Sequence, residues 1–515
     1  MIEVEVHSSL RAFLREQGQP SWPHHLTMAR LVARALRRSR PALIQTGCPH
    51  SSYCLSYLAP ALIWTGPAIL VAPVALQQWL LRVEIPRLQQ WIGTNKPIQT
   101  GDTFPDEHFQ GLVITSPKSW LADRFEGRHG FPSGIPTLIA GADDLEGWAR
   151  DQLQAGIQPG DWDELMLGRP QQADLIRDVR VRLTKTVFQH PPNPYECYLI
   201  ETSEQDTLRQ LLEVLQPSAS DGQYCYLPRV WKSFWHSWQR SGQLMWATVA
   251  RSQGQFSLYC GPVEVATALS QIWSQQPVVL IGEALDLDTS ASVYRQQLGL
   301  GDLTCLKFSP DRQNELIQLY LPDGLPMPNT PRFQDALIRE VRTLLTLSTN
   351  LKSPVVILVG DVPLKAQLGA VLAAEFGSRV QVEKTNLDDT GILVTGWEFW
   401  RDHQSVIGKP QLLIVATLPI PSLENPLVAG QVAYYKQQHL DWFRLYLLPV
   451  ALRELQRAIA PVRDSQGVVA LLDNRVNHRS YGRQVLSALS PFARINYLDA
   501  SWFRPDTPTA QEQWF

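Results

Sequence analysis

The sequence has few cysteines, and none of them lie in the close pairs that disulfide or zinc frameworks use. The six cysteines among 515 residues stand at positions 48, 54, 197, 225, 260 and 305, with no C-x-x-C pair. Small disulfide-built domains are dense in cysteine, and structural zinc sites have short ligand spacings. The pattern therefore excludes a disulfide framework and favours reduced thiols.

An excess of charge and a long apolar run are also missing. Lys and Arg total 46 against 49 Asp and Glu, which gives a formal net charge of −3. A nucleic-acid surface would therefore be a local basic groove and not a property of the whole chain. No run reaches the roughly 18 apolar residues of a membrane-spanning helix, and no signal peptide is apparent. We expect a cytoplasmic protein with no membrane partner.

The main pattern that is present is a series of short aliphatic runs separated by longer amphipathic stretches. The runs lie at 68–73, 111–116, 136–142, 277–282, 354–361, 391–396, 411–421 and 467–475. Strands of a parallel sheet that are buried on both faces have such sequences. The pattern predicts an α/β protein with two parallel-sheet lobes and a mostly helical insertion in the first.

The expected organisation has four parts. Residues 1–145 form the N-terminal part of the first lobe, 146–255 the helical insertion, 256–310 the end of the first lobe and the crossover, and 311–515 the second lobe. The stretch 321–333 carries four prolines, which is typical of a connector between domains.

The stretch LIQTGCPHSSYCLSYLAPAL at 43–62 has the outline of a strand, a phosphate loop and a helix. Further strings occur in the order seen in DinG/XPD-like helicases of superfamily two. SYLAPAL (56–62) resembles the segment after the family's phosphate loop, and ALQQWLLRVEIPRL (75–88) is similar to the segment after motif Ia. LPIPSLENPLVAGQVAYYK (418–436) resembles the second lobe. The resemblance spans nearly the whole chain and implies two RecA-like lobes, an arch-like insertion, and an ATP- and Mg²⁺-dependent DNA helicase.

The positions that carry the family's chemistry depart from its pattern. The alignment places Gly47 at the family's Ala, Ser52 at its last Gly, Tyr53 at its Lys and Cys54 at its Ser/Thr. A working loop needs backbone N–H groups, a lysine and a hydroxyl for Mg²⁺. Tyr53 has no charge, and a cysteine is a poor ligand for a hard cation. We interpret the loop as one that has kept its fold and lost its function.

Motif II of the family is the DEAH box, whose two carboxylates hold Mg²⁺ and polarise the attacking water. The resemblance places Ala140 and Gly141 at these positions, while Asp143 and Asp144 lie close by. The family's S-A-T-L motif becomes GEAL at 282–285.

Motif VI matches QRAIAPVR at 456–463. Gln456 and Arg463 stand, whereas Ala460 takes the place of the arginine that would reach the γ-phosphate. An XPD-like iron–sulfur cluster needs four cysteines between the loop and the DEAH box. Apart from Cys54, none lies between Ser51 and Glu196, so no cluster is expected.

Two basic clusters are candidate contacts for nucleic acid. The candidates are Arg229, Lys232, Arg240, Arg475 and Arg479. The first three alternate with aromatic residues at 229–246, which could stack on the bases of a single strand. Trp231, Phe234, Trp235 and Trp238 instead have the spacing of a helix packed against the first lobe. The alternative for the second cluster is a solvated face.

Cys48, His50 and Cys54 lie together, but their spacing fits no zinc pattern, and we expect no metal. The sequence predicts a pseudoenzyme that binds nucleic acid, such as single-stranded DNA, or a protein partner without ATP-driven unwinding. Two alternatives stay open. One is an active ATP-dependent helicase, with ATP and Mg²⁺, in which Asp143 or Asp144 supplies the lost acid and a remote Lys or Arg replaces Tyr53. The other is a protein scaffold that binds no nucleic acid.

Overall fold

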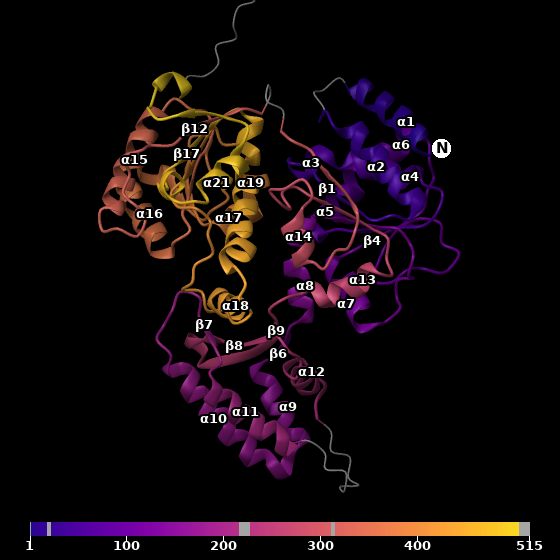
Figure 1. Cartoon of the computed structure of the whole chain (residues 1–515), viewed down its shortest axis with the longest axis vertical. Coiled ribbons are helices and arrows are strands. Elements are labelled where there is room, and N and C mark those ends of the chain that lie inside the picture. The colour runs from indigo at the N-terminus through magenta and orange to yellow at the C-terminus, as the bar shows by residue number, and fades with distance from the viewer. Residues whose placement is uncertain (1, 18–21, 216–226, 311–314, 504–515) are drawn as a thin grey trace, which may run out of the picture.

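The computed structural model describes residues 2–17, 22–215, 227–310 and 315–503. Cys225 and the expected start of the second lobe at residue 311 lie outside these ranges. Figure 1 shows two lobes side by side, with the insertion extending below them. In the described part of the chain, no helix has the length and apolar character needed to cross a membrane.

The first lobe is built on a seven-stranded parallel sheet with the order β11-β1-β10-β5-β2-β4-β3. Its strands are β1 (Ala42–Gln45), β2 (Ala68–Val71), β3 (Ile98–Thr100), β4 (Leu112–Thr115), β5 (Thr137–Ala140), β10 (Val278–Gly282) and β11 (Thr304–Lys307). The five central strands are buried on both faces, as their aliphatic sequences require. One face is covered by α1 (Ile2–Gln17), α2 (His25–Arg38) and α4 (Leu55–Ile63). The other is covered by α7 (Pro117–Glu126), α8 (Leu145–Leu153) and α13 (Ala266–Trp273).

The second lobe repeats this architecture with the strand order β14-β15-β13-β16-β17-β12-β18, again all parallel. Its strands are β12 (Ile317–Tyr320), β13 (Val355–Leu358), β14 (Val380–Val382), β15 (Ile392–Thr395), β16 (Leu412–Val415), β17 (Val468–Leu471) and β18 (Phe492–Ile495). Helices α15 (Phe333–Leu347) and α16 (Val362–Phe376) cover one face, and α17 (Trp397–Ile407), α19 (Leu448–Asp464) and α21 (Gly482–Leu489) cover the other.

The proline-rich stretch 321–333 lies inside the second lobe. It runs from β12 to α15, and β12 pairs with β17 and β18. The prediction that this stretch connects two domains is therefore wrong. β12 is a strand of the second sheet that the sequence pattern did not reveal.

The insertion contains helices and also a sheet that was not predicted. The helices are α9 (Pro159–Gly168), α10 (Ala173–Gln189), α11 (Thr202–Leu215) and α12 (Arg229–Trp238). Strands β6 (Ala155–Ile157), β7 (Cys197–Leu199), β8 (Gln243–Ala250) and β9 (Gln255–Pro262) form an antiparallel sheet with the order β6-β9-β8-β7.

The aromatic stretch 229–246 packs inside the insertion and not against the first lobe as expected. Helix α12 ends at Trp238, and Gly242, with φ +69°, turns the chain into β8. The ring of Trp231 meets that of Trp162 edge-on, with 4.8 Å between centroids, and Trp231 is fully buried. The spacing of these aromatic residues thus arises because they form the core of the insertion.

The insertion also touches the second lobe. Helix α18 (Pro426–Gln437) of that lobe lies on β7 and β8 (Figure 1). A Cβ atom at Gly430 would lie 2.6 Å from Cδ1 of Leu244, so the missing side chain permits this close approach.

Candidate functional site

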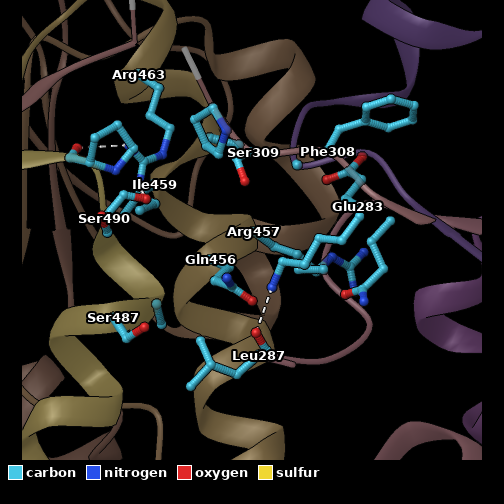
Figure 2. A pocket seen from close by; sticks show the side chains of 18 of the residues that line it. Glu283, Leu287, Phe308, Ser309, Gln456, Arg457, Ile459, Arg463, Ser487 and Ser490 are labelled. Carbon is cyan, nitrogen blue, oxygen red and sulfur yellow. Dashed lines mark hydrogen bonds between the residues drawn. The ribbon is translucent and has the colours of Figure 1, made fainter. Parts of the chain in front are cut away.

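A cavity of about 310 Å³ opens between the lobes at the carboxyl ends of the first lobe's strands (Figure 2). Gly47, Glu283 and Lys307 line it from the first lobe, and Gln456, Arg457 and Arg463 line it from α19. In open parallel sheets, ligands bind at the carboxyl ends of the strands. The cavity is therefore the candidate functional site.

The loop after β1 supplies one wall of the cavity. It bends at Gly47, whose φ of +69° favours glycine. The short helix α3 (His50–Tyr53) follows and leads into α4. Ser52 is half-buried, and Tyr53 and Cys54 are buried. Of the four predicted loop positions only Gly47 lines the cavity, and Tyr53 and Cys54 belong to the core of the first lobe.

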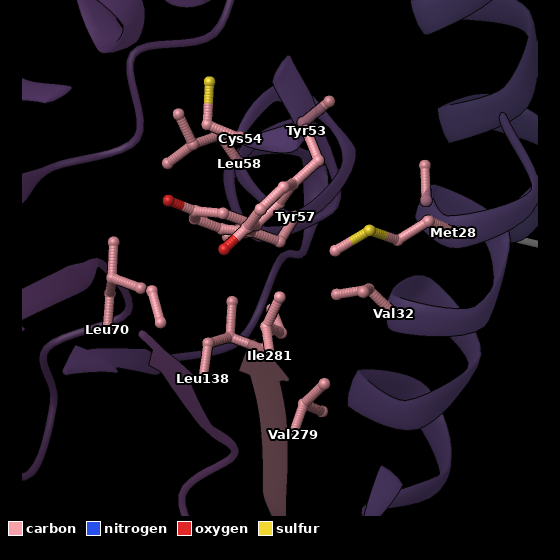
Figure 3. Packing of buried hydrophobic residues seen from close by; sticks show 14 of the residues in the cluster. Met28, Val32, Tyr53, Cys54, Tyr57, Leu58, Leu70, Leu138, Val279 and Ile281 are labelled. Atoms are coloured by element: carbon pink, nitrogen blue, oxygen red, sulfur yellow. The ribbon is translucent and has the colours of Figure 1, made fainter. Parts of the chain in front are cut away.

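A hydrogen-bonded group of neutral side chains stands behind the loop. His50 Nδ1 lies 2.9 Å from the hydroxyl of Tyr53, and its Nε2 lies 2.6 Å from that of Tyr57. Figure 3 shows both tyrosine rings in the core, between Met28 of α2 and Ile281 of β10. Burial lowers the pKa of His50 to about 3 and raises the pKa of both phenols. The group therefore has no charge near neutral pH.

Glu283, which follows β10, takes up two N–H groups of the loop. Its carbonyl oxygen accepts from the Gly47 N–H (3.0 Å), and its Oε1 accepts from the His50 N–H (3.2 Å). Burial raises the pKa of Glu283 to about 8, aided by the nearby Asp143 and opposed by Arg457. The backbone carbonyl and the carboxyl group of Glu283 thus each occupy one N–H group of the loop that a phosphate would need.

The residues after β5 hold neighbouring segments in place. Ala140 is buried and Gly141 takes a positive φ of +77°. Asp143 accepts the backbone N–H groups of residues 283 and 284, each at 2.8 Å. Asp144 faces the second lobe and accepts from Arg457 Nη1, also at 2.8 Å.

Helix α19 brings three of the predicted motif VI positions to the cavity, namely Gln456, Ala460 and Arg463. Both terminal nitrogens of Arg463 donate to backbone carbonyls, including those of Leu489 (2.6 Å) and Ser490 (3.0 Å). Burial lowers the pKa of Arg463 to about 10. Its side chain therefore holds the loop before β18 and does not reach across the cleft.

Two arginines that were not predicted as site residues do reach across the cleft. Arg453 lies 3.8 Å from Glu146, and Arg457 pairs with Asp144. Figure 2 shows Arg457 on α19 facing Glu283. Burial disfavours its charge, but the carboxyl groups of Asp143, Asp144 and Glu283 raise the pKa of Arg457. The available signal was the four-residue spacing of the two arginines, which places them on one helix face.

The structure does not bring the nucleic-acid candidates together. Arg229, Lys232 and Arg240 are exposed on or beside α12 of the insertion. Arg479 is exposed shortly before α21 of the second lobe, and α21 lies far from α12 (Figure 1). Arg475 differs from them because its side chain is paired with the buried Asp473 at 2.5 Å.

The cysteines near the loop are not arranged as ligands. No group of three or more His, Cys, Asp or Glu within the described ranges is placed to hold a metal ion. Burial raises the pKa of Cys48 and of Cys54, which keeps both thiols protonated, whereas metal ligation needs the thiolate.

Comparison with known proteins gives matches in both sequence and fold. Residues 408–492 match the helicase C-terminal domain family. The ATP-dependent DNA helicase YoaA of Haemophilus influenzae is 24% identical over 261 residues, 48% of this chain and 40% of that protein. The chain thus spans well under half of this relative's length.

Solved structures of XPD proteins share the fold. One named XPD_Helicase has a TM-score of 0.60 at 10% identity, covering 92% of this chain and 100% of that one. Xpd4 of S. tokodaii has a TM-score of 0.57 at 12% identity, covering 92% of this chain and 100% of that one. The family match, the YoaA relative and this fold together confirm the resemblance of the chain to DinG/XPD-like helicases of superfamily two.

Proposed function

We propose that this protein binds nucleic acid through a helicase fold whose ATPase motifs are degenerate, so that it does not unwind DNA with ATP. The observation that carries the proposal is the loop after β1. The neutral His50, Tyr53 and Tyr57 group stands at the place of the phosphate-binding lysine, and Glu283 occupies two of the loop's N–H groups.

The residues of the cleft do not fit ATP and Mg²⁺. Phosphoryl transfer depends on a lysine, a magnesium ion and an arginine that offset the charge of the phosphates. Loss of the arginine alone lowers turnover by about 10³–10⁵. Here the phosphate side of the first lobe presents the carboxyl group of Glu283, and the thiol of Cys54 is a poor substitute for a hydroxyl ligand of Mg²⁺. An iron–sulfur cluster does not fit either, since the sequence has no cysteine between Cys54 and Cys197.

The contacts of Asp143 and Asp144 argue against an active motor with substituted residues. Asp143 is engaged by two backbone N–H groups, and Asp144 is engaged by Arg457. Taking up Mg²⁺ would break these bonds. Both residues act as ties between segments, which is the role we assign to them.

Nucleic acid is the ligand we propose because the helicase fold is retained and the matched relative is named a DNA helicase. The exposed side chains of Arg229, Lys232, Arg240 and Arg479 are candidate phosphate contacts. A protein partner is the alternative ligand for the same fold.

Binding of a fluorescent ATP analogue with Mg²⁺, and of single-stranded DNA, tests the proposal on one sample. We expect no saturable nucleotide binding up to millimolar concentration, and DNA binding that weakens steeply with salt. Saturable nucleotide binding with ATP hydrolysis would contradict the degenerate motor. Failure to bind DNA at low salt would contradict the nucleic-acid part and leave a protein scaffold.

A further inference from the structure

We infer that four charged side chains hold the two lobes closed without any nucleotide. This interlobe clasp consists of Asp144 and Glu146 on the first lobe and Arg453 and Arg457 on α19 of the second. The inference goes beyond the proposed function, since it concerns the conformation of the whole chain and not its ligand.

The central contact of the clasp is two-pronged. Arg457 Nη1 donates to Asp144 Oδ1 at 2.8 Å, and Nη2 donates to Oδ2 at 3.4 Å. Only 17% of the Arg457 side chain is exposed. An arginine that bonds a carboxylate through two nitrogens, and is shielded from water, forms a stronger pair than an exposed one.

The second contact follows from helical geometry. Arg453 lies one turn before Arg457 on α19, and Glu146 lies at the start of α8, two residues after Asp144. The 3.8 Å between Arg453 and Glu146 places this pair beside the first one. Two neighbouring pairs fix the orientation of α19 as well as its distance from the first lobe.

Uncharged contacts extend the same surface. Gln297 of α14 (Ser292–Gln297) donates to the carbonyl of Leu445 at 2.9 Å and accepts from Arg453 at 3.2 Å. Leu287 of the first lobe packs against the hydrophobic core of the second lobe. These contacts shield the two arginines from water, with 13% of the Arg453 and 17% of the Arg457 side chain exposed, and this strengthens the attraction. The Asp144 side chain is more open, at 43% exposed.

A second set of contacts limits rotation about the clasp. Helix α18 of the second lobe rests on the insertion, where Gly430 meets Leu244 and Tyr434 meets Gly242. The second lobe is thus attached to the rest of the chain at the cleft and at the insertion. Opening the cleft requires both attachments to yield.

The clasp replaces what a nucleotide does in a motor of this architecture. A ligand shifts a conformational equilibrium only by its differential affinity for the two states. Here the arginines of the second lobe already have carboxylate partners on the first lobe. Mg²⁺-ATP therefore has no open state to close, and the lobes do not cycle.

Small-angle X-ray scattering of the full chain, with and without Mg²⁺-ATP, tests the clasp. We expect wild-type scattering to match the closed structure and to be unchanged by nucleotide. The double variant Arg453→Glu/Arg457→Glu should show a larger radius of gyration and maximum dimension. The matched control is Arg339→Glu/Arg342→Glu, which makes the same charge change on α15, a helix on the outer face of the second lobe (Figure 1). It should stay compact.

A second variant separates opening from misfolding. Asp144→Asn/Glu146→Gln removes the same attraction from the first-lobe side and leaves α19 unchanged, so it should also expand while circular dichroism stays native. Two results would overturn the clasp: both clasp variants remaining as compact as wild type, or wild type changing its dimensions with Mg²⁺-ATP. Nucleotide binding measured on the same samples keeps the proposals apart, because a wild type that binds ATP and stays compact contradicts only the proposed function.

Discussion

The two walls of the cleft carry opposite charge. Where the lobes meet, the first lobe presents the carboxylates of Asp144 and Glu146 and the second lobe presents Arg453 and Arg457. Lys307 of the first lobe is turned to carbonyl groups of its own lobe. A motor that holds a triphosphate between its lobes needs positive groups on both walls, because the ligand is the anion. Here the first lobe supplies the anion itself. The difference between the walls indicates a cleft whose partner is the other half of the same chain.

Side chains of the protein itself provide both the packing behind the loop and the negative charge opposite Arg457. Tyr53 and Tyr57 fill the volume behind the loop with neutral rings, and both are fully buried. Asp144 supplies the negative charge that pairs with Arg457, whereas burial raises the pKa of Glu283 and leaves its carboxyl group largely protonated near neutral pH. The closed arrangement of the fold therefore rests on side chains of the chain itself.

A lysine at position 53, where the related helicases have one, should have the largest effect on stability. Tyr53→Lys should lower the free energy of unfolding by about 3 kcal/mol or more, because it buries an ammonium among neutral groups. Urea denaturation measures the loss. Tyr53→Phe is the control, since it removes only the hydrogen bond to His50 and should cost about 1 kcal/mol. A stable lysine variant that gains ATP binding would show that the loop is still a nucleotide site.

A substitution of Asp143 tests whether this carboxylate is placed to bind a ligand or to hold neighbouring segments of the chain. Asp143→Ala leaves the N–H groups of residues 283 and 284 without their acceptor and should cost about 2–3 kcal/mol. Thermal unfolding monitored by circular dichroism gives the change. Asp151→Ala, on the exposed side of α8, should stay within about 0.5 kcal/mol of wild type. Equal stability of the two variants would remove the structural role assigned to Asp143.

The central strands of both lobes were predictable with the exception of β12, and the edge strands were not. The runs that predicted β2, β4, β5, β10, β13, β15, β16 and β17 are aliphatic because these strands are buried on both faces. Edge strands such as β3 and β18 are short and partly exposed, so no continuous apolar run marks them. In β9, buried and more exposed residues alternate, and no apolar run marks this strand, most of which the prediction assigned to the end of the first lobe. Strand β8 lies wholly within the stretch that was predicted as the helical insertion.

The candidate site was predictable only where it is local. The order of strand, loop and helix at 43–62 is local, and the structure has β1, α3 and α4 there. The clasp joins residues 313 positions apart, Asp144 and Arg457, and no local pattern relates them. Likewise, the contact between Glu283 and the loop exists only because β10 lies beside β1 in the sheet.

The pH dependence of the free energy of unfolding tests the buried state of Glu283. The folded-state pKa of Glu283, about 8, lies above its ordinary value of 4.5, so the folded protein favours the protonated form. The resulting stabilisation is complete below pH 4.5 and is lost as the pH rises through 8. Wild type should therefore lose more stability between pH 5 and 9 than Glu283→Gln, as measured by urea denaturation at each pH. Glu213→Gln, an exposed position on α11, should follow the wild-type curve.

Arginines outside the cleft provide the smallest and most specific test. Arg479 is exposed and lies in the second basic cluster, unlike Arg457, which is held by carboxylates. Arg479→Glu should weaken single-stranded DNA binding for all sequences and reduce the slope of log K against log salt by about 1, without changing thermal stability. Fluorescence anisotropy at several salt concentrations measures both quantities. Arg332→Glu makes the same charge change at an exposed position before α15 and should leave the slope unchanged. If both variants lose affinity equally, the affinity for DNA depends only on the net charge of the protein, and the basic cluster around Arg479 is not a contact surface.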